Sequence, residues 1–331
     1  MPLPTMRDVS LVDEVLSNLS VAYAQKPEKF AAHKIAPVIN VQKQSGTYPI
    51  WNKGDFNRDD FRRRSPGGGF ARSGGAVSSA TYLCQQWGLE EQIADEIVKN
   101  ASSSVDVEQA AIVRLTNKGL IRRERIVATN LFGTSLWARD VAGVASGPSA
   151  VQHVYWDNAS SDIINDIHTE CDSIEQSTGH RPNRFMTNPA VWKVMKNDPA
   201  IVDRHKYTSK DPISKAAVAA LCGIGDEGNP GEIVVMSASY NTANEGATTS
   251  MSWVIGDVGL LAYIAPAPRM EEPSAIYTFS FSEFDFVKDG GAAIGRYREE
   301  QTKSDILRGE MYLDVKLVAS DCGTYFSDLL T

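Results

Sequence analysis

The amino-acid sequence predicts an α+β fold, because helical and strand-like patterns occupy separate stretches of the chain. Apolar side chains recur at helical spacing through residues 106–132, whereas they alternate with polar ones through residues 277–281 and 311–317. A third pattern lies between residues 41 and 88, where two strand-like runs flank a basic, glycine-rich stretch. With 331 residues the chain is long enough for two domains of about 150 residues each.

The composition argues against several classes of protein. Lys and Arg number 33 against 41 Asp and Glu, a net charge of −8, which disfavours a basic surface that coats nucleic acid. The longest apolar stretches run to about ten residues, half of the ~20 that a membrane helix needs, so we expect no membrane partner. Residues 1–7 precede a polar pattern without the apolar centre of a signal peptide, and the four cysteines lack CxxC spacing. We therefore expect a non-secreted protein with free thiols in a reducing cytoplasm.

Charge is distributed unevenly along the chain. Residues 41–88 contain seven basic and three acidic side chains, a net charge of +4. Residues 151–270 have a net charge of −5, and residues 271–331 one of −6. One basic segment therefore belongs to a chain that ends in a strongly acidic one.

The segment from residue 41 to residue 88 is predicted to be a long two-stranded arm. Tyr48 and Ile50 alternate with polar residues, and residues 78–87 form a second strand-like run after a loop tip marked by Pro66 and three glycines. An isolated hairpin is marginal in water, and a structureless tip of about 20 residues is uncommon unless it is functional. The arm either folds back on its own domain or is covered by another subunit, and we favour the second. Four aromatic residues lack enough aliphatic neighbours to bury them: Trp51, Phe56, Phe61 and Phe70.

Helices are predicted at residues 8–24, 90–100 and 106–132 from the spacing of apolar side chains. The last has Asp106 as its N-cap and Gly133 at its end, and at 1.5 Å per residue it would be about 40 Å long. Residues 133–158 are rich in small side chains and are predicted to be a connection.

An α/β pattern follows. One helix begins after Ser160 or Ser161 and ends at Gly179, another begins at Pro189, and a third covers residues 214–222. The strands predicted here are 185–187, 233–237, 252–255 and 260–265, with a polar loop at 238–250.

No stretch of the sequence has the residue spacing of a known motif for catalysis, cofactor binding or metal binding. Residues 223–228 match GxGxxG, but they follow a helix and precede a strand, the reverse of the dinucleotide-binding order. A calcium-loop pattern that starts at Asp55 fails, because Asp60 stands where Gly is needed and Pro66 where Glu is needed. The five histidines show no metal spacing, and no GxSxG sequence occurs. We expect a protein that is not an enzyme and has no cofactor or metal; a hydrolase or transferase of two α/β domains is an alternative.

The order of these parts resembles the major capsid proteins of tailed bacteriophages, whose shell fold is named after phage Hong Kong 97. Residues 30–55 are similar to the family's entry into its extended loop, with an aliphatic-Pro pair and a Lys-x-Ser-Gly-x-Tyr sequence. Residues 180–207 resemble its axial-domain segment, in which Pro-Asn precedes a short strand and an Asn-Pro-x-x-Trp helix. Residues 232–268 resemble its two strands around a variable loop, followed by Gly-Asp and an apolar strand.

The resemblance implies four parts: an N-terminal arm at 1–41, an extended loop at 42–88, a peripheral domain of 89–155 plus 271–331, and an axial domain at 156–270. It implies that copies of the chain form pentamers and hexamers in an icosahedral shell, assembled in the bacterial host cytoplasm as part of a virion. The shell would enclose double-stranded DNA without sequence preference. The other partners it suggests are a portal, a decoration protein, and either a separate scaffolding protein or none. An encapsulin-type nanocompartment shell, which has the same fold and encloses cargo enzymes, is the alternative.

The segregated charge suggests how such subunits would associate. Closed shells need contacts between two different surfaces, and a basic arm meeting an acidic body would set the orientation of neighbours. Arginine would supply bidentate, charge-assisted contacts, and phenylalanine would supply apolar ones. The alternative is that the arginines touch packaged DNA. We expect six residues of the loop tip to dock on the acidic, strand-rich C-terminal region of an adjacent subunit: Phe61, Arg62, Arg63, Arg64, Phe70 and Arg72.

Overall fold

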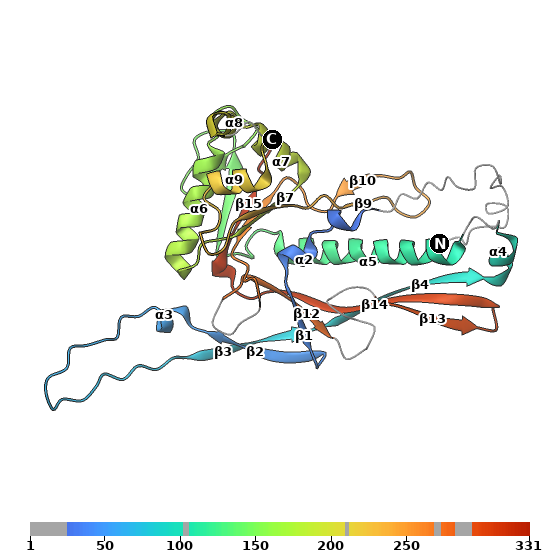
Figure 1. Ribbon diagram of the computed structural model, residues 1–331, viewed down its shortest axis with the longest axis horizontal. Coiled ribbons are helices and arrows are strands. Elements are labelled where there is room, and N and C mark those ends of the chain that lie inside the picture. Colours follow the sequence, from blue (N-terminus) through green and yellow to red (C-terminus); the bar gives the residue numbers. More distant parts are fainter. Residues whose placement is uncertain (1–24, 102–105, 209–211, 268–272, 282–292) are drawn as a thin grey trace.

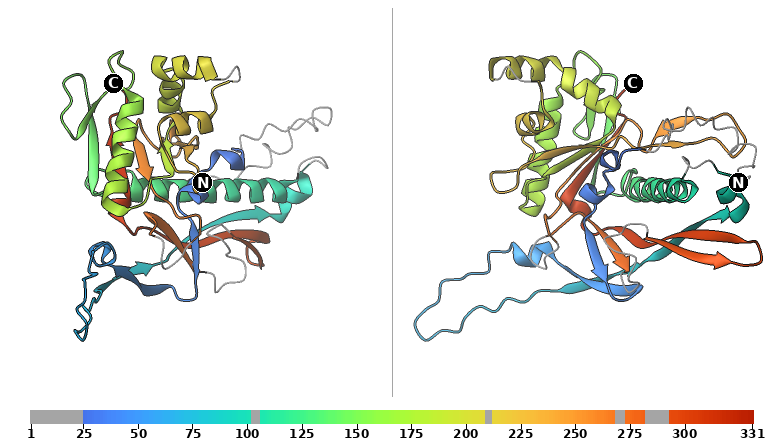
Figure 2. Two further views of the ribbon diagram at one scale, coloured as in Figure 1. Left: turned by 60° about the vertical axis from the view of Figure 1, so that its left-hand side comes forward. Right: turned by 45° about the vertical axis from the view of Figure 1, so that its right-hand side comes forward.

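A computed structural model describes residues 25–101, 106–208, 212–267, 273–281 and 293–331. The helix predicted at residues 8–24 lies outside these ranges. The described chain forms two main sheets with a long helix between them, and a thin arm projects from one end (Figure 1). Figure 2 shows from two further directions that the far end of the arm extends away from both sheets.

The first sheet has five strands and includes most of the C-terminal segment. Its order is β1–β12–β14–β13, and β4 also pairs with β14. The strands are β1 (Val38–Val41), β4 (Gln85–Ala94), β12 (Ile276–Phe281), β13 (Ala293–Glu299) and β14 (Ser304–Leu317). The long helix α5 (Val107–Leu131) lies along this sheet (Figure 1). At one end of the helix, Leu115 packs with Ile93 of β4 and Leu307 of β14.

The second sheet has six strands and is flanked by four helices. Its order is β6–β5–β15–β11–β7–β8. The strands are β5 (Arg139–Val144), β6 (Gln152–Val154), β7 (Arg184–Thr187), β8 (Glu232–Val235), β11 (Gly259–Ala262) and β15 (Gly323–Ser327). The helices are α6 (Ile163–Thr178), α7 (Pro189–Asn197), α8 (Pro199–Thr208) and α9 (Lys215–Leu221). Buried Trp156, Phe185 and Phe326 pack together on this sheet.

Shorter elements connect these layers. They are η2 (Pro27–Lys29), α2 (Ala32–Ile35), β2 (Ser45–Trp51), α3 (Lys53–Phe56), β3 (Val77–Leu83), α4 (Asp95–Asn100), β9 (Ser239–Asn241), β10 (Met251–Trp253) and η3 (Ser320–Cys322). One hydrophobic cluster joins the two sheets, because Leu131 of α5 packs in the same core as Leu260 of β11 and Leu313 of β14. The four cysteines are free and buried, as predicted.

The ends of α5 follow from local signals, as predicted. The Asp106 side chain accepts a hydrogen bond from the Gln109 amide at 2.9 Å and so caps the first turn. Leu131 is the last helical residue, and its carbonyl accepts the indole N–H of Trp137 at 2.8 Å. Gly133 follows directly after the C-cap.

The ends of α6 agree with prediction at one end and differ at the other. The helix is closed by Gly179, whose φ of 77° lies in the left-handed region that favours glycine. Its N-cap is Asp162, which accepts the Asn165 amide at 3.1 Å, and not the predicted Ser160 or Ser161.

Residues 90–94 form a strand and not the start of the predicted helix 90–100. β4 pairs with β14 through Ala94, and the helix α4 begins only at Asp95. Side chains reinforce the pairing, since Arg308 donates to Glu90 at 2.6 Å. The long ladder overrides a helical pattern because strand formation depends on cross-strand partners that the local sequence does not contain.

The six-stranded sheet crosses the predicted domain boundaries. Residues 133–158, predicted to be a connection, supply β5 and β6, and the C-terminal segment supplies β15. β15 pairs in parallel with β5 and antiparallel with β11. The segments expected in the peripheral domain therefore complete the sheet expected in the axial domain. β4 of the five-stranded sheet begins at Gln85, within the range 42–88 expected for the extended loop.

A buried carboxylate joins the long helix to the segment that leads into the arm. Glu124 of α5 is fully buried and accepts a hydrogen bond from the Ala32 amide, at the start of α2, at 2.6 Å. Burial raises the pKa of the Glu124 carboxyl from 4.5 to about 7, against the opposing effect of the α2 amides and of Arg123. Glu124 thus satisfies an amide of α2 that has no partner within that helix.

Candidate intersubunit contact site

The arm is held at its base by stacked aromatic rings. β2 and β3 pair antiparallel with each other and with no other described strand. The ring of Phe279 on β12 lies 5.4 Å from the Tyr48 ring and 4.6 Å from the Tyr82 ring, centroid to centroid, and is stacked on both. Gly46 is the cross-strand partner of Tyr82, and a Cβ there would lie 2.6 Å from the Tyr82 hydroxyl. Glycine at position 46 therefore leaves the space that the tyrosine ring occupies.

Beyond the two strands, the short helix α3 forms an ion pair with the described part of the body. Lys53 Nζ lies 2.5 Å from Asp321 Oδ2, at η3. Trp51 and Phe56 pack edge to face with their centroids 5.9 Å apart, yet Phe56 is mostly exposed. These contacts orient the start of the tip without burying it.

The tip, residues 57–76, contains neither helix nor strand. The side chain of Phe61 is 99% exposed and that of Phe70 is 77% exposed. Arg64 bridges the tip, because its Nε donates to the Gly68 carbonyl at 2.6 Å and its guanidinium lies 4.4 Å from the centroid of the Phe70 ring. The prediction that the chain would leave these aromatic residues uncovered is confirmed.

Two carboxylates hold the limbs of the tip together. Asp60 accepts the Ser73 hydroxyl at 2.8 Å, and Asp55 accepts the Ala76 amide at 2.9 Å. Asp55 also lies 4.0 Å from Arg58. The tip is therefore a defined loop whose hydrogen bonds are internal and whose outer side chains face solvent.

Of the six predicted site residues, the structure brings Arg64 and Phe70 together. Arg62, Arg63 and Arg72 are exposed, and none of them forms a hydrogen bond or ion pair with another described residue. Phe61 is likewise without a ring partner among the described residues. Three unpaired guanidinium groups and a fully exposed phenylalanine thus occupy one end of the molecule.

The C-terminal region is less negative than its residue count suggests. Five of its carboxylates form ion pairs within the chain: Glu300, Asp305, Glu310, Asp314 and Asp321. Arginines of this region also pair with carboxylates elsewhere: Arg298 donates two hydrogen bonds, of 2.5 and 2.6 Å, to Asp95. A docking surface for the tip must therefore be sought where carboxylates outnumber their partners.

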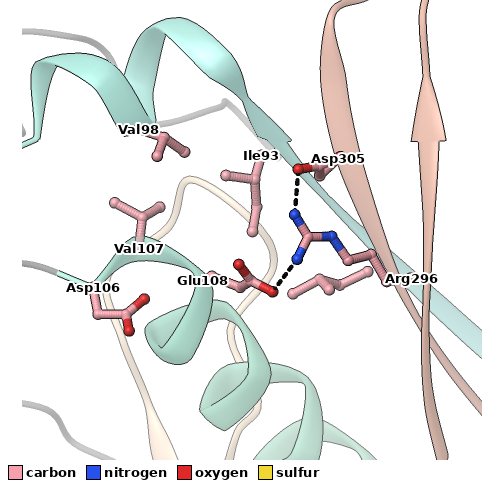
Figure 3. A pocket seen from close by; sticks show the side chains of 8 residues that line it. Ile93, Val98, Asp106, Val107, Glu108, Arg296 and Asp305 are labelled. Atoms are coloured by element: carbon pink, nitrogen blue, oxygen red, sulfur yellow. Dashed lines mark hydrogen bonds and ion pairs between the residues drawn. The ribbon is translucent and has the colours of Figure 1, made fainter.

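One cleft meets this condition, and it lies between β4, α4, the start of α5 and the β13–β14 pair (Figure 3). It has a volume of about 170 Å³. Arg296 lies 2.7 Å from Glu108 and 2.6 Å from Asp305, so one guanidinium serves two carboxylates, and Asp106 is a third. Its apolar lining residues are Ile93, Val98, Val107 and Leu307. The sequence analysis did not single out Asp106 or Glu108 for this role, because only the fold brings the start of α5 to the β13–β14 pair.

The described ranges hold no group of three or more His, Cys, Asp or Glu residues arranged to bind a metal ion. No helix within them is both long enough and apolar enough to cross a bilayer.

Comparison with known proteins relates the whole chain to one kind of protein. The major capsid protein of Burkholderia phage BcepMu is 26% identical over 319 residues, 96% of this chain and 97% of that protein. No family model matches the sequence. Over nearly its whole length, the chain is therefore similar to a phage major capsid protein.

Solved structures agree with this capsid fold. A phage-related protein from Bordetella bronchiseptica has a TM-score of 0.66 and 23% identity, over 96% of this chain and 97% of that one. The capsid of cyanophage P-SCSP1u gives a TM-score of 0.56 at 11% identity, over 93% and 90% of the two chains. The predicted Hong Kong 97-type α+β fold is therefore confirmed. An encapsulin from Synechococcus elongatus, at a TM-score of 0.50 and 9% identity over 99% and 96% of the chains, is similar in fold as well.

Proposed function

We propose that this capsid protein is the repeating subunit of an icosahedral phage head, in which pentamers and hexamers enclose double-stranded DNA. The observation that supports the proposal most directly is the arm, because its tip exposes Phe61 and Phe70. Three of its arginines, Arg62, Arg63 and Arg72, have no hydrogen-bond or ion-pair partner in the described chain. Exposed aromatic side chains next to arginine are typical of protein interfaces. A neighbouring subunit is the partner that a shell protein always has.

The placement of the arm favours contact between two different surfaces. The arm tip and the acidic cleft lie at opposite ends of the long axis of the molecule (Figure 1). Contacts between unlike surfaces form rings when the rotation between neighbours closes, and pentamers and hexamers are such rings. A contact between identical surfaces would end at a dimer.

We place the tip of one subunit against the cleft of the next. The cleft has an apolar floor that suits a phenylalanine side chain. Its three carboxylates exceed the two guanidinium groups that pair with them, those of Arg296 and Arg298. Arg62 and Arg63 would donate to Asp106 and Glu108, while Phe61 would cover the apolar floor. Only part of this cleft, with Arg296, Asp305 and Leu307, belongs to the C-terminal region that the sequence analysis selected; Asp106 and Glu108 come from the start of α5.

The experiment replaces Arg62, Arg63 and Arg64 with Glu. If each docked tip loses about 3 kcal/mol of charge-assisted contacts, the protein concentration needed for assembly rises more than a hundredfold. Shells should therefore vanish from electron micrographs at concentrations where the wild type assembles, while the circular dichroism of the subunit stays unchanged. Reversing two exposed lysines of α7, Lys193 and Lys196, is the matched control and should leave shells intact. Unchanged shells in the arginine variant would contradict the docking role.

Added salt should weaken wild-type assembly, because exposed ion pairs are screened over ~8–10 Å.

The content of the shell separates a phage head from the alternative, an encapsulin-type compartment. A phage head implies a portal, a separate scaffolding protein or none, and non-specific contact with packaged DNA in a virion assembled in the host cytoplasm. The full-length phage relative supports this reading over the encapsulin. Particles purified from infected cells should be DNA-filled and tailed, whereas small shells filled with cargo enzymes would favour the encapsulin reading.

A further inference from the structure

A second recess lies far from the arm tip, where the six-stranded sheet meets α2. It has a volume of about 440 Å³ and opens to solvent. The starts of β7 and β8, the residues that follow β11, and α2 converge on it. Its charged or titratable lining residues are His33, Lys34, Arg184 and Glu232; its walls include Pro37, Ile264 and Pro266.

The floor of this recess is rigidly built. Asn183 is 1% exposed, and its side chain donates to the Ile264 carbonyl at 2.8 Å and accepts the Ile264 amide at 2.9 Å. The Asn183 backbone carbonyl also accepts the Glu232 amide at 2.9 Å. Through its side chain and its backbone, one buried residue therefore joins the ends of β7, β8 and β11, so the charged groups above it are held in place before any ligand arrives.

Positive charge exceeds negative charge in this recess. Glu232 is its one described carboxylate, and each oxygen already serves a different cation: Lys34 Nζ lies 3.1 Å from Oε1, and Arg184 Nη1 lies 2.8 Å from Oε2. Lys215, at the start of α9, forms no ion pair with another described residue. Burial lowers the pKa of the Lys215 ammonium, and repulsion by Lys34 adds to this effect.

Other groups around the recess do not neutralise it. Burial lowers the pKa of His33, and Arg123 and Lys34 lower it further, so His33 is mostly neutral near pH 7. The buried Arg184 Nε and the Asn229 amide nitrogen have no hydrogen-bond partner in the described chain. Lys34 and Arg184 therefore share one carboxylate, Lys215 adds positive charge within electrostatic range of both Lys34 and Glu232, and unused donors remain.

We propose that this recess receives a carboxylate side chain from a second copy of this chain within the shell, an inference that rests on the proposed function. A second carboxylate would balance the excess of positive charge and accept from the unused donors. The chain itself supplies such groups in excess, with 41 acidic against 33 basic side chains. A DNA duplex fits less well, because its phosphates lie on a rod too wide to enter a walled recess.

The test uses carbodiimide, which joins a lysine amine to a carboxylate as an amide and takes up the water released. Shells assembled from a mixture of ¹⁵N-labelled and unlabelled wild-type subunits are coupled, digested and analysed by mass spectrometry. The proposal predicts mixed-isotope peptides that join Lys34 or Lys215 to a carboxylate of another subunit, present in shells and absent from unassembled protein. Coupling confined to one chain, whether to Glu232 or to the undescribed Glu271 and Glu272, would overturn it.

A pair of variants tests the energetic role. Lys34→Gln with Lys215→Gln should raise the protein concentration needed for shell formation about tenfold or more, whereas Lys193→Gln with Lys196→Gln, an equal charge change on α7, should change it less than twofold. Thermal unfolding of the unassembled subunits confirms that both variants fold. Equal assembly of both variants would overturn the proposal, and so would a defect limited to DNA retention in the first. Failure of the wild type to form any shell would instead refute the proposed function.

Discussion

Glu124 offers the sharpest test of how burial controls stability in this protein. The perturbation is Glu124→Gln, which keeps a carbonyl oxygen for the Ala32 amide and removes the ionisable group. Burial raises the pKa of Glu124 from 4.5 to about 7. Since one pKa unit is worth about 1.4 kcal/mol, this difference corresponds to about 3 kcal/mol of stability that depends on pH.

The sign follows from which state binds the proton more tightly. The folded state has the higher pKa, so the contribution of Glu124 is fully present below pH 4.5 and is lost as the pH rises through about 7. Relative to Glu124→Gln, the free energy of unfolding of the wild type should fall by about 3 kcal/mol between pH 4.5 and pH 8.

The assay is urea unfolding of the unassembled subunit at several pH values, with the wild type and the variant compared at each. His153 contributes an opposite slope, because burial lowers its pKa from 6.5 to about 4 and stability is lost as the pH falls through that range. That slope is common to both proteins and cancels in the difference. Glu227→Gln, at an exposed turn, is the matched control and should follow the wild-type profile. A wild-type minus Glu124→Gln difference that stays flat from pH 4.5 to 8 would refute the reasoning.

Two further substitutions test the base of the arm and the floor of the recess. Phe279→Ala should cost about 4 kcal/mol and release the arm, because it removes the ring on which Tyr48 and Tyr82 stack; hydrogen exchange of the β2 and β3 amides should speed up. Phe326→Ala, in the six-stranded sheet, is the control: it should lower the free energy of unfolding in urea by a similar amount without selectively releasing the arm. Equal hydrogen exchange of the β2 and β3 amides in both variants would contradict the stacking role. Asn183→Ala should cost about 3 kcal/mol, because it leaves the amide and carbonyl of Ile264 unpaired, and should lower carbodiimide coupling at Lys34; a neutral effect on both would contradict a built floor.

The arm and the long helix could be predicted from sequence because their signals are local. The Asp106 cap and the apolar spacing that follows it suffice for α5, and the glycines with Pro66 mark the tip of the arm. The exposure of Phe61 was also predictable, since no aliphatic side chains nearby in the sequence could cover it. Six tip residues were selected on charge and aromatic content, and their docking role remains a prediction.

The acidic cleft and the basic recess could not be predicted in the same way. Glu108 and Arg296 are distant in sequence, as are Lys34 and Glu232, and each pair meets only after the sheets have formed. A count of acidic residues in the C-terminal segment overestimated its free negative charge, because intrachain arginines already occupy several of them. Local sequence records the charge of a segment but not which charges remain unpaired.

The sequence by itself determined the ends of α5, the thin arm and its exposed basic tip, because each depends on residues within a few positions of one another. Tertiary structure decided that residues 90–94 are a strand, that β5 and β15 share a sheet, and where unpaired charge gathers. The physical reason is that strand pairing and ion pairing are completed by partners from remote parts of the chain. Their free energy exceeds the local preference of a short segment.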